Sequence, residues 1–245
     1  MIKQVGKPFV LRGINQICII MKTKFIAFVS ALLVISSASQ AQILKGGVNF
    51  ANISINNDGD VDDNKVLSSF QVGISGDIKI VSFLYFQPGV YFTGKGSKTQ
   101  SGETTDATYY RATTNPYYVE IPANFVLKTP GAVKFFAGAG PYIAIGVAGK
   151  NKVEGKFLGT SFNSEDKIEW SDDDPTTLNY EEGAGYGILK RFDYGLNGIA
   201  GIETKNLVLS ANYGYGLAKL QSGSNSSDDD KNKHRVFSVT VGIKF

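Results

Sequence analysis

Apolar and polar residues alternate along most of the chain after residue 42. The clearest stretch runs from Leu67 to Ile80, where every second residue from Phe70 onwards is apolar or glycine and the residues between are polar or glycine. Side chains of a strand point alternately to two faces, so this period of two predicts a strand with one apolar face and one polar face. Eight such stretches are present, and we predict a strand in each: Leu44–Ile53, Leu67–Ile80, Phe83–Lys95, Tyr117–Lys128, Val133–Val147, Arg191–Glu203, Leu207–Leu217 and Arg235–Phe245.

The connections between these stretches alternate in length. Three are short, at 81–82, 129–132 and 205–206, whereas 54–66, 96–116, 148–190 and 218–234 are long and polar. Short turns at one end and long loops at the other are the pattern of outer-membrane barrels, and each stretch has about the length that a tilted strand needs to cross a bilayer. We therefore predict an all-β fold, an eight-stranded antiparallel up-and-down transmembrane β-barrel. No stretch after residue 42 has 18 consecutive apolar residues, which excludes a helical membrane protein for this part.

Two barrels could carry such strands. A soluble, lipocalin-like carrier would turn the apolar face inward, and a membrane barrel would turn it outward into lipid. Aromatic residues on the apolar face gather toward the long-loop ends of seven of the eight strands. Because aromatic rings prefer the membrane–water interface, this one-sided girdle favours the membrane barrel. Its residues are Phe50, Phe70, Phe92, Tyr117, Phe192, Tyr194, Tyr213, Tyr215 and Phe237.

The polar face carries glycine, asparagine, serine and scattered charges. An eight-stranded barrel has an interior just wide enough for side chains to fill it. Glu120, Arg191 and Asp193 are predicted to point inward near the loop ends. Because unpaired buried charges are costly, we interpret them as an interior salt-bridge network that fills the barrel. The alternative is a charged lining for a small solute pore.

The N-terminal residues have the features of a targeting segment. Lys22 and Lys24 precede an apolar run, which is followed by small residues up to Ala41. We predict three parts: residues 1–20 as a mis-called extension ahead of the true initiator Met21, 21–41 as a signal peptide cleaved after Ala41, and 42–245 as the barrel domain. The alternative is an N-terminal membrane anchor, for which the apolar run is short.

Composition narrows the functional classes only slightly. The formal net charge of +3 is too small to suggest a nucleic-acid binder. The 28 glycines, the 12% aromatic content and the 19% charged content suit strands and turns better than long helices. The single cysteine, Cys18, excludes an internal disulfide and lies upstream of the predicted mature start.

Candidate chemistry is sparse. The sequence from Asp58 resembles the start of a calcium loop, but Asp63 stands where glycine is expected and Ser69 where the closing acid is expected. We interpret it, and the runs 172–174 and 228–230, as solvated acidic loops, with divalent ions that bridge lipopolysaccharide as the alternative. His234, the only histidine, lacks a distinctive serine motif for a hydrolase. Gly94-Lys95-Gly96 lacks the helix that a phosphate loop needs. We predict no catalytic, cofactor-binding or metal-binding residue.

Several short motifs occur in the order seen in one bacterial family. They are Leu84-Tyr85-Phe86-Gln87-Pro88-Gly89-Val90, Tyr118-Val119-Glu120-Ile121-Pro122, Gly140-Pro141-Tyr142, Phe192-Asp193-Tyr194-Gly195 and Tyr213-Gly214-Tyr215-Gly216-Leu217. In these the chain resembles the PorT-like outer-membrane β-barrel family of Bacteroidetes. The resemblance implies the barrel architecture; the founding member is tied to protein secretion, and nothing in this sequence selects that role. The C-terminal stretch resembles the signal read by the barrel-assembly machinery, carried here by Val241, Ile243 and Phe245.

We therefore expect a non-enzymatic protein of the cell outer membrane with a structural role or a role in interactions made by its loops. The alternatives are a small passive pore and an outer-membrane lipid hydrolase or acyltransferase. The expected partners are outer-membrane lipid and lipopolysaccharide, the barrel-assembly machinery during biogenesis, and an unknown envelope protein that binds loop 148–190, which holds the only tryptophan, Trp170. We expect no nucleic acid and no cofactor.

Overall fold

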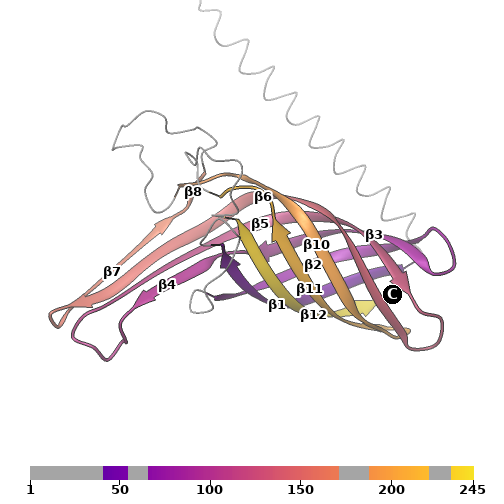
Figure 1. The fold of residues 1–245 in the computed structure, drawn as a ribbon, viewed down its shortest axis with the longest axis horizontal. Helices are drawn as coiled ribbons and strands as arrows, with labels where there is room; N and C mark the ends of the chain where they lie inside the picture. Colours follow the sequence, from indigo (N-terminus) through magenta and orange to yellow (C-terminus); the bar gives the residue numbers. More distant parts are fainter. Residues whose placement is uncertain (1–40, 55–65, 171–187, 221–232) are drawn as a thin grey trace, which may run out of the picture. The chain divides into compact units, whose positions relative to one another are not determined.

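Eight antiparallel strands close into a barrel in the computed structural model, which describes residues 41–54, 66–170, 188–220 and 233–245 (Figure 1). Strands that are neighbours around the ring pair with each other, and β12 pairs with β1 to close the ring. The eight predicted strands and the predicted fold are confirmed. The ring consists of β1 (Ala41–Ile53), β2 (Leu67–Lys79), β3 (Leu84–Gly94), β5 (Tyr109–Lys128), β6 (Lys134–Phe157), β10 (Phe192–Glu203), β11 (Leu207–Gly216) and β12 (His234–Lys244).

The two ends of the barrel differ in the length of their connections. Residues 80–83, 129–133 and 204–206 form short turns at one end, called the turn end below. The long connections lie at the other end, called the loop end. The first residues of β1 and the C-terminal Phe245 both lie at the turn end. There the Phe245 amide donates a hydrogen bond to the Gln42 carbonyl over 3.0 Å. The chain thus completes an even number of passes within the described residues, as predicted.

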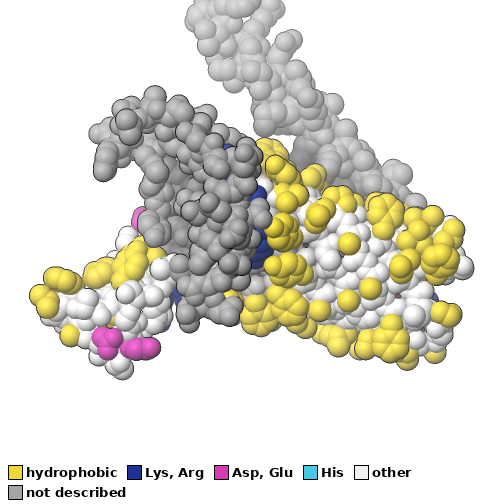
Figure 2. All heavy atoms as spheres, in the orientation of Figure 1, with side chains coloured by type: hydrophobic (Ala, Val, Ile, Leu, Met, Phe, Trp, Pro, Cys, Tyr) yellow, Lys and Arg dark blue, Asp and Glu magenta, His cyan; other side chains and the backbone are white. Residues whose placement is uncertain are grey.

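The outer wall of the barrel is apolar. Ile74, Leu127 and Ile143 expose 50%, 53% and 57% of their surface, and Figure 2 shows hydrophobic side chains over much of the visible wall. Polar residues on the same strands, such as Asp77 and Asn124, are buried inside. In water so much exposed apolar surface would cause aggregation, whereas in a bilayer the lipid tails solvate it. The polarity is the one predicted for a membrane barrel.

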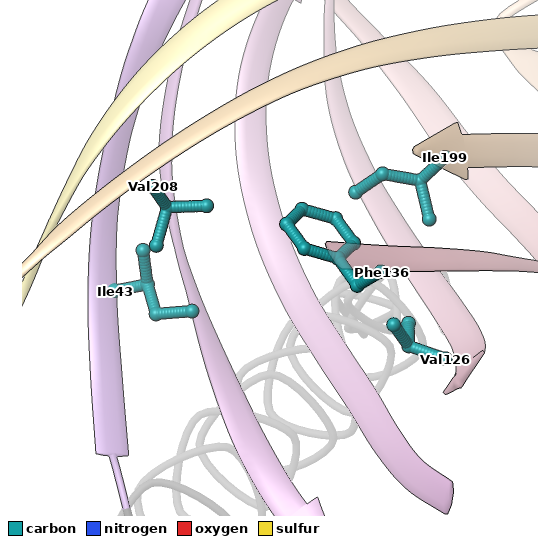
Figure 3. Close-up of a cluster of buried hydrophobic side chains, with 5 residues drawn as sticks. All are labelled: Ile43, Val126, Phe136, Ile199 and Val208. Carbon is teal, nitrogen blue, oxygen red and sulfur yellow. The ribbon is translucent and has the colours of Figure 1, made fainter. Parts of the chain in front are cut away.

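An apolar cluster that the alternation of residues did not predict lies inside the barrel. Five side chains from five different strands of the ring point inward and are almost completely buried: Ile43, Val126, Phe136, Ile199 and Val208 (Figure 3). Their strands also carry apolar residues outward, as in Phe135 beside Phe136, so alternation of polarity is lost there. The interior is therefore filled by apolar as well as by polar groups.

β5 and β6 continue beyond the barrel wall at the loop end. Their distal halves, 109–117 and 148–156, pair with each other. β4 (Ser97–Ser101) adds to β5, and β7 (Thr160–Lys167) adds to β6. These four strands form a projecting sheet, called the extension below, which Figure 1 shows running away from the ring. The segments 96–116 and 148–190, predicted as loops, thus hold strands that lengthen the wall.

A bulge in β6 lies between the barrel and the extension, and the outward face changes from apolar to charged above it. The register of β5 and β6 shifts between Tyr117 and Tyr118, which leaves Val147 as the extra residue. Below the bulge the outward side chains are apolar; above it they include Arg111, Lys150 and Lys152. The extra residue shifts the alternation of β6 by one position, so Lys150 and Lys152 face outward above the bulge, whereas β5 keeps its alternation and Arg111 shares the face of Tyr117. The change from apolar to charged outward residues marks the level at which the wall passes from the lipid into water.

Some predictions fall on segments outside the description. The predicted extension at 1–20 and the signal peptide at 21–41 lie there, apart from Ala41, where β1 begins. The candidate calcium loop lies there for residues 58–65, as do the acidic runs 172–174 and 228–230. Across the described ranges, no helix has the length and apolar character needed to span a membrane.

Candidate functional site

A buried lysine holds two carboxylates together near the loop end of the lumen. Lys95 follows directly after β3, and its Nζ lies 2.6 Å from Glu120 Oε2 on β5 and 2.8 Å from Asp193 Oδ2 on β10. The side chains of Lys95 and Asp193 are 3% and 0% exposed. Burying charges is costly unless each has a partner, and here one cation faces two anions. This loop-end cluster crosses the lumen from one wall to another.

Aromatic rings surround the loop-end cluster. The Tyr142 hydroxyl donates to Asp193 Oδ2 over 3.2 Å, and Lys95 Nζ lies 4.1 Å from the centre of the Tyr142 ring. A hydroxyl donor and the negative face of a ring both stabilise ionised groups in such a place. Tyr118 is fully buried beside them, with its hydroxyl 3.3 Å from His234 Nε2. The histidine considered for hydrolysis is therefore buried against a tyrosine.

Trp170 closes the mouth above these rings. Trp170 belongs to β8 (Glu169–Trp170), which pairs in parallel with β9 (Ile188–Leu189). The ring of Trp170 meets the ring of Tyr118 edge to face, with centres 5.6 Å apart. It approaches β6 so closely that a Cβ atom on Gly146 would lie 2.2 Å from it. The only tryptophan, predicted as a loop residue open to partners, thus packs inside the fold.

A second ionic cluster lies at the turn end of the lumen. Lys128 on β5 pairs with Asp77 on β2 and with Glu203 on β10, and Lys244 on β12 pairs with the same two carboxylates. Gln87 donates to Asp77 Oδ1 over 2.8 Å. Lys128, Asp77 and Glu203 are all 3% exposed or less. This turn-end cluster adjoins the apolar cluster of Figure 3, since Lys128 Nζ lies 5.7 Å from the Phe136 ring centre.

Little space remains between the two clusters. A polar cavity of about 30 Å³ is lined by residues that include Lys45, Thr93, Asn124 and Asn197. A water molecule needs roughly 10–15 Å³ by this measure, so the cavity has room for about two or three. Asn124 Oδ1 is buried there without a hydrogen-bond partner among the described residues, and water would satisfy it. Side chains of the two ionic clusters and of the apolar cluster thus occupy the lumen on either side of this cavity.

Of the three predicted interior residues, two lie in the lumen and one is exposed. Glu120 and Asp193 come together, whereas Arg191 lies exposed at the start of β10. The cation between the two acids is Lys95, the last residue of the predicted strand Phe83–Lys95, which was also weighed as part of a phosphate loop. Alternation with Gln87 and Thr93 puts Lys95 on the polar face, but it does not show which acids across the lumen it meets.

The predicted girdle residues lie on the outward face toward the loop end. Phe70, Phe92 and Tyr117 form one contact group, with the Phe92 and Tyr117 ring centres 5.4 Å apart, and Phe50 stacks on Phe237 over 6.4 Å. Phe192, Tyr194 and Tyr213 are exposed. Tyr215 is covered by Arg235, whose guanidinium carbon lies 3.6 Å from the ring centre.

The three residues of the predicted assembly signal share the outward face of the last strand. Val241 and Ile243 belong to β12, and Phe245 follows it; they expose 51%, 58% and 70% of their surface. β12 pairs along its whole length with β1. The three residues of the predicted signal therefore belong to the C-terminal segment whose strand closes the ring.

The outward face of the extension carries ion pairs above the bulge. Arg111 Nη1 lies 2.9 Å from Glu154 Oε1, Lys152 pairs with the other oxygen of Glu154, and Lys150 pairs with Glu165. The hydrogen bond from Lys152, with that from Arg111, lowers the pKa of Glu154 below its ordinary value of 4.5. These charges belong to a water-exposed surface, because isolated pairs of this kind gain little and need hydration.

The chain matches one known protein family and is similar to several solved structures. The family model described as outer membrane protein beta-barrel domain matches residues 42–222. No curated protein matches the chain. Among solved structures, the chain is similar to Ail, the attachment invasion locus protein of Yersinia pestis, at 16% identity and a TM-score of 0.38, covering 84% of this chain and 98% of that one. It is similar to OprG from Pseudomonas aeruginosa at 12% identity and a TM-score of 0.40, covering 85% and 97%.

Proposed function

The chain belongs to the outer membrane protein β-barrel domain family and lies in the outer membrane, and on this premise we propose that it is a closed barrel which acts through its projecting extension. In such barrels the long loops face the outside of the cell and the short turns face the periplasm. The extension at the loop end therefore stands on the outer surface. The barrel anchors it, and its lumen passes no solute.

The filled lumen is the observation that carries this proposal. The loop-end cluster with Trp170, the turn-end cluster and the apolar cluster beside it occupy the lumen, and the polar cavity among the described residues between them has about 30 Å³. A solute pore needs a continuous wet path, whereas this space holds about two or three waters. The extension, by contrast, offers strands and exposed side chains to the surroundings.

Conductance in planar lipid bilayers tests the closed lumen. We expect purified, folded protein to give no stable current steps, while a porin inserted in the same bilayer shows that channels would be detected. Migration on gels before and after boiling verifies that the added protein is folded. Stable channels of uniform size from the folded protein would refute the proposal.

We also propose that the protein is not a lipid hydrolase or acyltransferase. The support is the position of His234, whose Nε2 atom faces the Tyr118 hydroxyl in a fully buried site. A hydrolytic histidine must instead reach a nucleophile and the substrate. We expect no release of fatty acid from phospholipid or lipopolysaccharide in detergent. Release that is lost in His234→Asn would contradict this.

Within the family, we place the chain among the PorT-like barrels of Bacteroidetes. The support is the order of the motifs, two of which meet across neighbouring strands, since Pro122 on β5 lies opposite Tyr142 on β6. A sequence profile built only from PorT-like barrels tests this placement. It should align all five motifs to this chain without gaps inside the strands; an alignment that misses the motifs on β5 and β10 would refute it.

A further inference from the structure

β7 forms one of two open edges of the extension, whereas the ring of eight strands closes on itself. A closed barrel has no edges, but in the described part of the chain the extension ends in β4 on one side and β7 on the other. β7 has eight residues, and all of them are exposed. An edge strand presents unpaired N–H and C=O groups that can template another strand. β7 is therefore a ready acceptor for β-strand addition.

The geometry of the hairpin identifies the backbone groups that face outward. A two-residue turn, Leu158-Gly159, joins β6 to β7, so Phe157 and Thr160 are directly opposite. In an antiparallel pair, alternate residues exchange both hydrogen bonds with the partner. Counting from that pair, Ser161 and Asn163 direct their N–H and C=O groups away from β6. Their backbone groups are the ones an added strand would bind.

The first five residues of this edge lack the usual protection against pairing, whereas Glu165, Asp166 and Lys167 put charges at its far end. Natural edge strands are commonly protected by charges, proline or a bulge. From Thr160 to Ser164 β7 has no charged residue and no proline, and its pairing with β6 runs without a register shift. β4 differs, because it has only five residues with Lys98 among them. Of the two edges, β7 has the longer uncharged run, five residues against three in β4, and is the better acceptor for a partner strand.

Large apolar side chains lie beside the open edge. Phe157, Leu158 and Phe162 expose 62%, 76% and 46% of their surface, and Figure 2 shows hydrophobic side chains at the end of the extension. Leu158 has a φ of 47°, a conformation that asparagine or glycine adopts at lower cost. An exposed leucine in a strained turn is thus unfavourable for the isolated hairpin. A bound apolar group would offset that cost.

We propose that the outer edge of β7 binds an extended segment of another polypeptide by antiparallel strand addition. The inference rests on the proposed function, because it names the kind of partner that the extension takes. Backbone hydrogen bonds from Ser161 and Asn163 hold the segment. Alternate apolar side chains of the segment pack beside Phe162, on the inner face of the extension.

A second copy of this chain in the same membrane does not fit the edge in this way. Two copies with the same orientation in one membrane have β7 strands that run in the same sense along the membrane normal. Antiparallel pairing of β7 with β7 would instead point the two barrels in opposite directions. A free segment carries no such restriction, and it is the occupant that the geometry favours.

The test uses a fluorescein-labelled peptide, KVTVTVTK, with the full-length refolded protein in detergent. We expect saturable anisotropy with the wild type and none with the matched peptide KVPVPVPK, which cannot form a ladder. Asn163→Pro removes an outward N–H and leaves the bonds to β6, so it should weaken binding roughly tenfold. Asn163→Thr, which keeps the N–H, should bind like the wild type, and Phe162→Ser should weaken binding.

Three results would overturn the proposal. One is the absence of binding to the wild type; another is equal binding to Asn163→Pro; the third is equal loss in Asn163→Pro and Asn163→Thr. Concentration-dependent dimers of the wild type that Asn163→Pro abolishes would assign the edge to a second copy. Unchanged Trp170 fluorescence and gel migration verify the fold of each variant. The conductance measurement tests the closed lumen independently of peptide binding. If the barrel conducts no ions and also binds no peptide, only the inference about β7 is refuted.

Discussion

Lys95 is the residue on which the loop-end cluster depends. It is the cation placed between Glu120 and Asp193, and it is almost completely buried. Lys95→Met would leave two carboxylates in a buried site without their partner. We expect the free energy of unfolding to fall by about 3–5 kcal/mol. Reversible urea unfolding of the refolded barrel, followed by gel migration, measures this change.

Lys205→Met provides the matched control for that substitution. Lys205 is exposed in a short turn, so its replacement should change the unfolding free energy by less than about 0.5 kcal/mol. Adding Asp193→Asn and Glu120→Gln to Lys95→Met should restore part of the lost stability, because the unpaired charges are removed. If Lys95→Met is as stable as the wild type, the cluster does not hold the lumen together.

Gly146 sets the position of Trp170. A Cβ atom there would lie 2.2 Å from the tryptophan ring, well inside contact distance. Gly146→Ala should therefore push Trp170 out of the mouth, seen as a red shift of its emission and stronger quenching by acrylamide. Gly198→Ala is the control, since its nearest atom would be 3.9 Å away. Since Trp170 is the only tryptophan, an unchanged spectrum in Gly146→Ala would contradict the packing.

At the scale of the strand, the sequence predicted those elements whose two faces meet different surroundings. All eight ring strands separate lipid from a mostly polar lumen, so their period of two is strong. β4 and β7 meet water on at least one face and carry polar residues on both, so their sequences resemble loops. The bulge near Tyr117 weakened the signal further, because it shifts the alternation within β6. Phe136 and Val208 were missed because their neighbours are apolar too.

The outward ion pairs of the extension predict a titration. The hydrogen bond from Lys152 is the main cause that lowers the pKa of Glu154, so Lys152→Met should raise that pKa toward 4.5. A lowered pKa in the folded state means that the pair contributes stability above about pH 4.5 and loses that contribution as the pH falls. Carbon-13 NMR of labelled glutamate carboxyls measures the shift. Lys150→Met, which affects Glu165, should leave Glu154 unchanged; if it shifts Glu154 equally, the assignment of partners is wrong.

Seen as a whole, the lumen is closed at two levels that share no residue. The sequence anticipated paired interior charges but could not choose the partners, because pairing across the barrel depends on how far each strand is staggered against the next. Strand order brings Lys95, from the end of β3, to acids on β5 and β10, while Lys128 and Lys244 meet the other two acids at the opposite end. Closure is therefore a property of the assembled ring.

Two separate levels of closure predict additive stability across the lumen and coupling within a level. Glu120 and Lys128 are eight residues apart on β5, which is about 27 Å along the strand. At that distance Lys95→Met and Lys128→Met should lower the unfolding free energy by amounts that add within about 0.5 kcal/mol. Lys128 and Lys244 pair with the same two carboxylates, Asp77 and Glu203. The losses of unfolding free energy in Lys128→Met and Lys244→Met should therefore deviate from additivity by about 0.5–3 kcal/mol.

Double-mutant cycles from urea unfolding measure both quantities on the same refolded protein. Coupling between Lys95 and Lys128 as large as that between Lys128 and Lys244 would mean that one network runs the length of the lumen through Lys45 and the polar cavity. A continuous polar network could relay protons even where solutes cannot pass. Additivity across the lumen, with coupling confined to each end, leaves the barrel as two independent plugs around a few waters, and leaves the extension as the part of the molecule that meets its partners.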